Sequence, residues 1–154
     1  MKHLITSAAL MIAALSVIFF YAPLELNQGV AQKIFYIHVA SALSMYLGFF
    51  ISFLFSISYL MKKKPMHFFL SHSALEVAYV FCVTMLITGP LWAKPIWGVY
   101  WTWEPRLTTT FIMWLMYSGY LLLHSYFKES NKRGYGILSA ISLISFVNVP
   151  LVHL

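Results

Sequence analysis

One histidine of this sequence lies where an ionisable side chain is costly. His38 follows Lys33 by five residues, inside an apolar run, which places it about 7 Å below the end of a helix that rises 1.5 Å per residue. An imidazole at that depth is expected to face protein or a cavity, and there it could ligate a metal ion. A neutral imidazole that hydrogen-bonds to a neighbouring helix is the alternative.

A tryptophan-rich stretch is the second candidate for chemistry. Residues 97–108 read WGVYWTWEPRLT and hold three of the five tryptophans of the chain. Clustered indoles suit a large flat apolar ligand, and Arg106 could pair with peripheral carboxylates. With an axial imidazole added, these groups meet the requirements of haem.

The same residues also fit roles without haem. Tryptophans anchor helices at a membrane interface, although such a belt spreads its aromatic residues over both interfaces. Glu104 and Arg106 could form an interfacial ion pair that only fixes the start of a helix. A quinone would use the aromatic rings, but it has no carboxylates for the cations.

The composition indicates a membrane protein. Of the 154 residues, 61% are hydrophobic and 9% are charged, whereas about a quarter of the residues of a soluble domain are charged. The formal net charge of +6 is ordinarily a topology signal in such a chain, so no nucleic-acid partner is expected. Cys82, the single cysteine, lies in an apolar run, where a thiol behaves as a small hydrophobe.

Five apolar segments are long enough to cross a hydrocarbon core, which takes about 20 helical residues. The sequence predicts an all-α polytopic transmembrane bundle and a single integral membrane domain over 1–154. The first segment is interpreted as a retained helix, because its apolar run exceeds the ~7–15 residues of a signal peptide. The expected helices are 4–22, 34–61, 73–91, 107–127 and 136–154, with an external tryptophan-rich segment at 92–106.

The positive charges predict the orientation of the bundle. Lysines and arginines in short loops are retained in the cytoplasm. Five alternating helices place seven of them on one side and three on the other, so the N-terminus is expected in the cytoplasm and the tryptophan-rich segment outside. The seven are Lys2, Lys62, Lys63, Lys64, Lys128, Lys132 and Arg133, and the three are Lys33, Lys94 and Arg106.

Prolines predict two helix boundaries. Gly89–Pro90 is expected to end the third helix, because proline removes a backbone donor and clashes with the preceding turn. Pro105 suits the first turn of the fourth helix, where a missing N–H costs nothing.

Three motifs resemble those of a known family. TGPLWAKPIWGVYWTWEPRLTTT (Thr88–Thr110) resembles the external tryptophan-rich segment of the cytochrome c maturation protein C family, the haem exporter protein C family of cytochrome c assembly. IFYIHVASA (Ile34–Ala42) resembles that family's first haem-ligand motif, and NVPLVH (Asn148–His153) resembles the segment that leads into its last external loop. The resemblance runs in order from about Gln32 to the end.

The resemblance implies a haem-handling role. His38 would be an axial ligand of the haem iron, and Trp97, Trp101 and Trp103 would form the haem-binding platform, beside Glu104 and Arg106. The cofactor would be haem b, held non-covalently and transiently at the periplasmic face of the bacterial inner membrane. A periplasmic haem chaperone, subunits of an ATP-binding transporter complex and membrane lipid are the implied partners. The chain would not be an enzyme.

The sequence departs from the family pattern within the tryptophan-rich segment and at the end of the chain. Glu104 stands where the family usually has Asp, and Pro105 stands where it usually has a small residue. The family also continues past the position of His153 into a loop with a second axial histidine and a sixth helix, whereas this sequence ends at Leu154. Either the gene is split or truncated, or the second ligand would come from another chain or a small molecule. A membrane-anchoring or permease-like subunit without haem and a quinone-site subunit are the rival functions.

Overall fold

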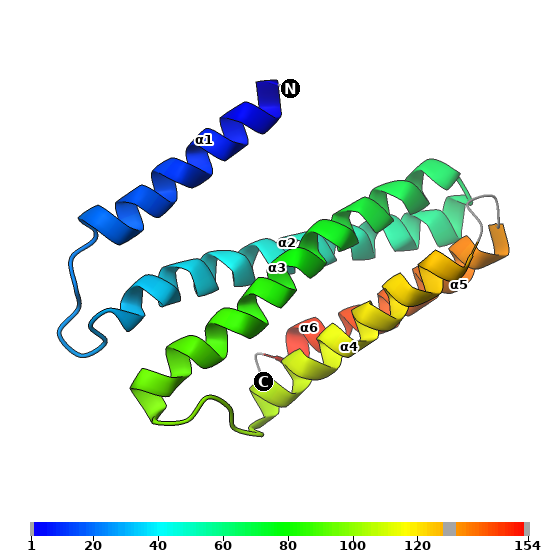
Figure 1. Ribbon diagram of the computed structural model, residues 1–154. Coiled ribbons are helices and arrows are strands. Elements are labelled where there is room, and N and C mark those ends of the chain that lie inside the picture. Colours follow the sequence, from blue (N-terminus) through cyan, green and yellow to red (C-terminus); the bar gives the residue numbers. More distant parts are fainter. Residues whose placement is uncertain (1, 128–131, 153–154) are drawn as a thin grey trace.

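The computed structural model is a bundle of helices (Figure 1). It describes residues 2–127 and 132–152, and within these ranges it contains no strand. The predicted all-α fold class is confirmed. In chain order the elements are α1 (Lys2–Ser16), the π-helix η1 (Val17–Tyr21), α2 (Ala31–Lys62), α3 (Pro65–Trp97), α4 (Pro105–Tyr126), α5 (Lys132–Phe146) and α6 (Asn148–Leu151).

Two long helices form the frame of the bundle. α2 and α3 make an antiparallel hairpin, with α4 and α5 beside it, and α1 lies apart (Figure 1). α1 has no buried residue, so its apolar surface is left for lipid or a partner. The segment that joins α3 to α4 lies at the end of the bundle where α2 begins (Figure 1). That end therefore brings together the first turns of α2, the last turns of α3 and the start of α4.

Four helical stretches of the described chain are long and apolar enough to cross a membrane, which makes it a multi-pass membrane protein. They are Lys2–Tyr21, Ala31–Lys62, Pro65–Trp97 and Arg133–Leu151. The expected fourth span corresponds to α4, whose 22 residues suffice in length. It is not among the four, because threonine, tyrosine, serine and histidine side chains lower its hydropathy.

The predicted end of the third helix at Gly89–Pro90 is wrong. α3 begins at Pro65 and continues through Pro90 and Pro95 to Trp97. Membrane helices tolerate proline because neighbouring side chains and local adjustments satisfy the freed backbone groups. The helix ends at Gly98, whose positive φ of 77° suits a residue without a side chain.

Other boundaries agree better with the sequence. Pro105 occupies the first turn of α4, as expected. The expected helix 4–22 is present as α1 followed by η1, and the expected helix 136–154 as α5 followed by α6. Residues 153 and 154 lie outside the described part of the chain.

The core combines aromatic stacking with buried hydroxyls. The rings of Phe49 on α2 and Tyr117 on α4 stack 3.8 Å apart at an interplanar angle of 7°. Ser52 Oγ lies 3.0 Å from Ser71 Oγ on α3 and 3.2 Å from Ser142 Oγ on α5. Small hydroxyl residues let helices approach and hydrogen-bond across their interface, so these serines join three helices.

Gly48 sets the distance between α2 and α3. A Cβ atom at this position would lie 2.7 Å from Ala78 Cβ and 3.2 Å from the Ala74 carbonyl oxygen. We expect Gly48→Ala to force the helices apart and to cost about 1–3 kcal/mol of stability. Thermal unfolding in detergent should show a lower Tm. Gly119→Ala in α4 is the control, because a Cβ there meets nothing within 4 Å, and an equal Tm for the two variants would contradict the close approach.

Candidate functional site

A cavity of about 400 Å³, here called the His38 cavity, lies at the end of the bundle where α2 begins and α3 ends. Ligand pockets commonly measure roughly 300–1,000 Å³ and combine apolar walls with a few polar groups. The His38 cavity fits this description. Its walls are Phe35, His38, Val39, Ala42, Leu43 and Tyr46 from α2, Met85, Leu86, Gly89, Pro90, Trp92, Ala93 and Trp97 from α3, Tyr100 and Trp101 from the following loop, Arg106, Leu107 and Thr110 from α4, and Val152.

His38 faces protein and cavity, as its depth in the apolar run predicted. Its ring is half-buried, and Nδ1 lies 3.2 Å from Thr88 Oγ1 on α3. A Cβ atom at Gly89 would lie 3.2 Å from His38 Cε1, so the imidazole rests against bare backbone. The interhelical hydrogen bond that was the alternative role is therefore present, and the ring also lines a cavity.

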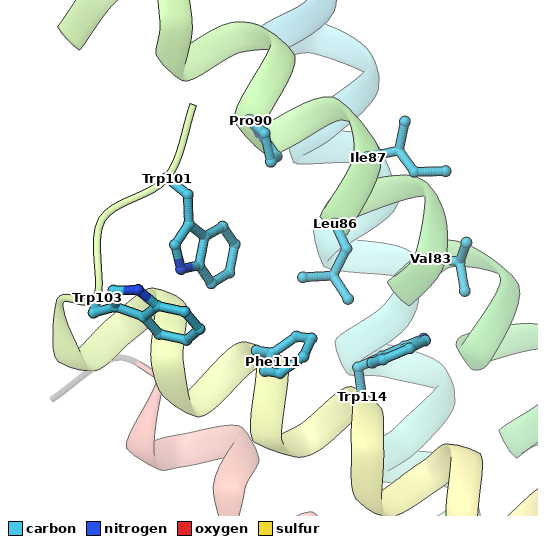
Figure 2. A pocket seen from close by; sticks show the side chains of 8 residues that line it. All are labelled: Val83, Leu86, Ile87, Pro90, Trp101, Trp103, Phe111 and Trp114. Carbon is cyan, nitrogen blue, oxygen red and sulfur yellow. The ribbon is translucent and has the colours of Figure 1, made fainter. Parts of the chain in front are cut away.

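The predicted tryptophans divide between two cavities. Trp97 and Trp101 line the His38 cavity, whereas Trp103 does not. Trp103 lines a second, almost wholly apolar cavity of about 420 Å³, where Figure 2 shows it with Trp101, Phe111 and apolar side chains of α3. The rings of Trp101 and Trp103 meet edge to face, 5.8 Å apart at 77°. Trp101 thus belongs to both cavities, and the indoles form walls at an angle instead of one flat shelf.

Trp101 also carries an unsatisfied donor. Its Nε1 is buried and has no hydrogen-bond partner among the described residues. A buried donor without a partner costs about 1–3 kcal/mol, and such groups in native proteins call for an explanation. Figure 2 shows this nitrogen on the side of the ring that faces Trp103.

Trp92 is a cavity residue that sequence reasoning did not include among the site residues. Its Nε1 donates to Gln28 Oε1 at 3.0 Å, which ties α3 to the segment before α2. Its ring lies 5.6 Å from Phe35 and meets Trp97 edge to face at 5.2 Å. The crowding of four tryptophans within residues 92–103 was the available signal for it.

The two charged candidates are close together, and one of them lines the cavity. Arg106 Nη2 donates to Glu104 Oε1 at 3.0 Å, which is the ion pair proposed as the alternative for both residues. Arg106 is also a wall residue of the His38 cavity, whereas Glu104 is not. Glu104 can therefore act on a ligand only through Arg106.

A pair of stacked imidazoles lies towards the other end of the bundle. The rings of His72 on α3 and His124 on α4 stack 3.7 Å apart, and His72 Nε2 lies 3.4 Å from Glu76 Oε1. Within residues 2–127 and 132–152, no group of three or more His, Cys, Asp or Glu side chains could hold a metal ion. A metal at His38 would therefore bring most of its ligands with it, as porphyrin-bound iron does.

The residues at the His38 cavity fit haem. The groups on its wall are one imidazole, aromatic rings beside it and an arginine. Iron in haem accepts an axial histidine, and guanidinium pairs with carboxylates. His153, the other histidine expected at this end, lies outside the described residues.

Comparison with known proteins identifies the family of the chain. The family model described as "Heme exporter protein C" matches residues 1–154. Relatives of that name are 33% identical over 132 residues in Bradyrhizobium diazoefficiens (85% of this chain, 49% of the relative) and 30% identical over 139 residues in Escherichia coli K12 (88% and 55%). Another, from Paracoccus denitrificans, is 34% identical over 104 residues (68% and 43%).

The chain spans about half the length of these curated relatives. The matched region includes the whole tryptophan-rich segment and the histidine of the cavity, since the family model covers every residue. The chain therefore belongs to the heme exporter protein C family.

Proposed function

We propose that this chain binds haem b, non-covalently and transiently, in the His38 cavity. The observation that carries the proposal is that one imidazole, three indoles and one guanidinium from three separate helices and a loop line the same cavity. Family membership supports haem as the ligand, because the relatives are named as heme exporters.

Each of the predicted residues of the cavity would make a different contact with the ligand. When bound, haem would supply an iron with open axial positions and two carboxylates. The imidazole of His38 would donate to the iron, the rings of Trp97 and Trp101 would contact the porphyrin, and Arg106 would pair with a carboxylate. These residues bind and orient the ligand without forming covalent bonds to it, so the chain would act as a carrier and not as an enzyme.

The cavity would open to the periplasm of a bacterial inner membrane. The charges support this orientation, because Lys33, Lys94 and Arg106 belong to the end with the cavity and the larger group of basic residues belongs to the other. Haem held there could pass to a periplasmic haem chaperone. Subunits of an ATP-binding transporter complex would be further partners, and the exposed α1 offers one surface for lipid or for them.

Titration of the purified chain in detergent with ferric haem tests this function. We expect a Soret band shifted from that of free haem and saturating near one haem per chain. A decyl quinone at the same concentration should not displace the haem. A folded protein that shows no saturable change would favour an anchoring subunit, and full displacement by the quinone would favour a quinone site.

Arg106 should contribute through the carboxylates of haem. Its side chain is exposed, so we expect Arg106→Gln to weaken haem binding by only about 1 kcal/mol, roughly fivefold. Haem dimethyl ester, which lacks free carboxylates, should bind the wild type and this variant equally. Lys94→Gln is the matched control, because Lys94 Nζ donates to the Gly98 carbonyl and does not line the cavity. A loss with the ester as large as that with haem would contradict the carboxylate pairing.

A further inference from the structure

We propose that Thr88 is the positioning residue of this site, because it fixes the tautomer and the orientation of the His38 imidazole so that Nε2 keeps its lone pair for a ligand. The consequence for haem rests on the proposed function. The hydrogen-bond arrangement itself belongs to the ligand-free protein.

The single hydroxyl proton of Thr88 is already used within α3. Thr88 Oγ1 donates to the Thr84 carbonyl oxygen at 2.8 Å, and the Met85 carbonyl oxygen is 3.4 Å away. A hydroxyl has one proton and two acceptor lone pairs. Toward His38 Nδ1, at 3.2 Å, Oγ1 therefore acts as the acceptor. Nδ1 carries the proton of the neutral ring, and Nε2 is the nitrogen with a free lone pair.

The backbone of α3 holds the same ring from a second direction. A Cβ at Gly89 would lie 3.2 Å from His38 Cε1 and 3.6 Å from Nδ1. The ring edge that carries Nδ1 and Cε1 is thus seated against Thr88 and Gly89. Both residues belong to α3, which packs along α2.

The arrangement is the one that metal-ligating histidines generally use. Such a histidine donates its other ring N–H to an oxygen, which fixes ring orientation and raises the basicity of the ligating nitrogen. Loss of that partner typically costs about 10–100-fold in metal affinity. Here the oxygen is a threonine hydroxyl from the neighbouring helix.

The first test uses the protein without haem. In the wild type labelled with ¹⁵N-histidine, the His38 signal, assigned by its loss in His38→Gln, should show Nδ1 protonated and Nε2 unprotonated. Thr88→Val removes the acceptor at nearly constant shape and should change this pattern, whereas Thr88→Ser should keep it. Thr84→Val is the matched control, because Thr84 Oγ1 donates only to the Val80 carbonyl oxygen one turn away in the same helix.

The second test is haem affinity followed at the Soret band. We expect Thr88→Val to bind about 10–100-fold more weakly, with Thr88→Ser and Thr84→Val close to the wild type. Nε2 protonated in the ligand-free wild type would overturn the inference whether or not the Thr88→Val protein folds. An unchanged affinity in a folded Thr88→Val protein would also overturn it. Absence of haem binding in the wild type, with Nδ1 protonated, would support the positioning of His38 and reject the proposed function.

Discussion

His38→Ala should remove the imidazole-ligated Soret band and lower haem affinity by about a hundredfold or more, about 3 kcal/mol. His38 is the one imidazole among the described residues that line the cavity, so no other described side chain there can replace it as a nitrogen donor to iron. Absorption spectra of the purified variant titrated with haem measure both quantities.

Free imidazole provides a direct check on that result. Truncation to alanine leaves space beside Gly89, so added imidazole should enter and restore the ligated spectrum. His67→Ala is the matched control, since His67 lies on α3 near the Lys63–Lys64 turn and its Nδ1 is 2.7 Å from Ser58 Oγ. An unchanged spectrum in His38→Ala, or an equal loss in His67→Ala, would contradict the assignment of the axial ligand.

Replacement of both Trp97 and Trp101 by leucine should weaken haem binding by about 1–3 kcal/mol, roughly 5–150-fold. Both rings line the His38 cavity, and leucine preserves apolarity while it removes the flat aromatic surface. The Soret titration again gives the affinity, and the Tm of the ligand-free variant reports any loss of folding.

Trp103→Leu is the control. It tests whether only Trp97 and Trp101 contact haem or whether all three indoles do. Trp103 is 73% exposed and lines only the second cavity, so its replacement should change affinity less than threefold, roughly 0.6 kcal/mol. A loss equal to that of the double variant would mean that the three indoles act on the ligand together, as the sequence alone suggested.

Some features depend only on the type of a residue and on its position within an apolar run. These features were predictable from the sequence. Apolar runs indicated the membrane bundle, and the cost of an imidazole inside such a run identified His38 as a residue that faces a cavity. The proline rule likewise placed Pro105 in the first turn of the fourth helix. These signals are local, so one sequence is enough to read them.

The detailed composition of the cavity was not predictable, because it depends on how one helix continues. Pro90 was expected to end α3, whereas the helix continues through it and carries Trp92 and Trp97 along one rigid element. The packing of α3 on α2 places Thr88 and Gly89 against His38, and Thr88 is fifty residues away from it in the chain. The hydrogen bond between Trp92 and Gln28 joins residues 64 positions apart, and no local sequence pattern predicts it.

The division of the tryptophans has a similar physical cause. Trp101 and Trp103 lie in the connection between α3 and α4, whose path is set by the packing of both helices and not by local propensity. Trp101 lines both cavities, whereas Trp103, two residues further along this segment, lines only the second cavity. Figure 2 shows the two rings in the second cavity.

Locating the iron is the measurement that tests the central claim most directly. Anomalous scattering at the iron edge from crystals of the haem-loaded chain would show where the metal lies. We predict one iron peak in the His38 cavity, within bonding distance of His38 Nε2. A peak beside the His72–His124 pair, or at any place outside the cavity, would contradict the assignment of this cavity as the haem site.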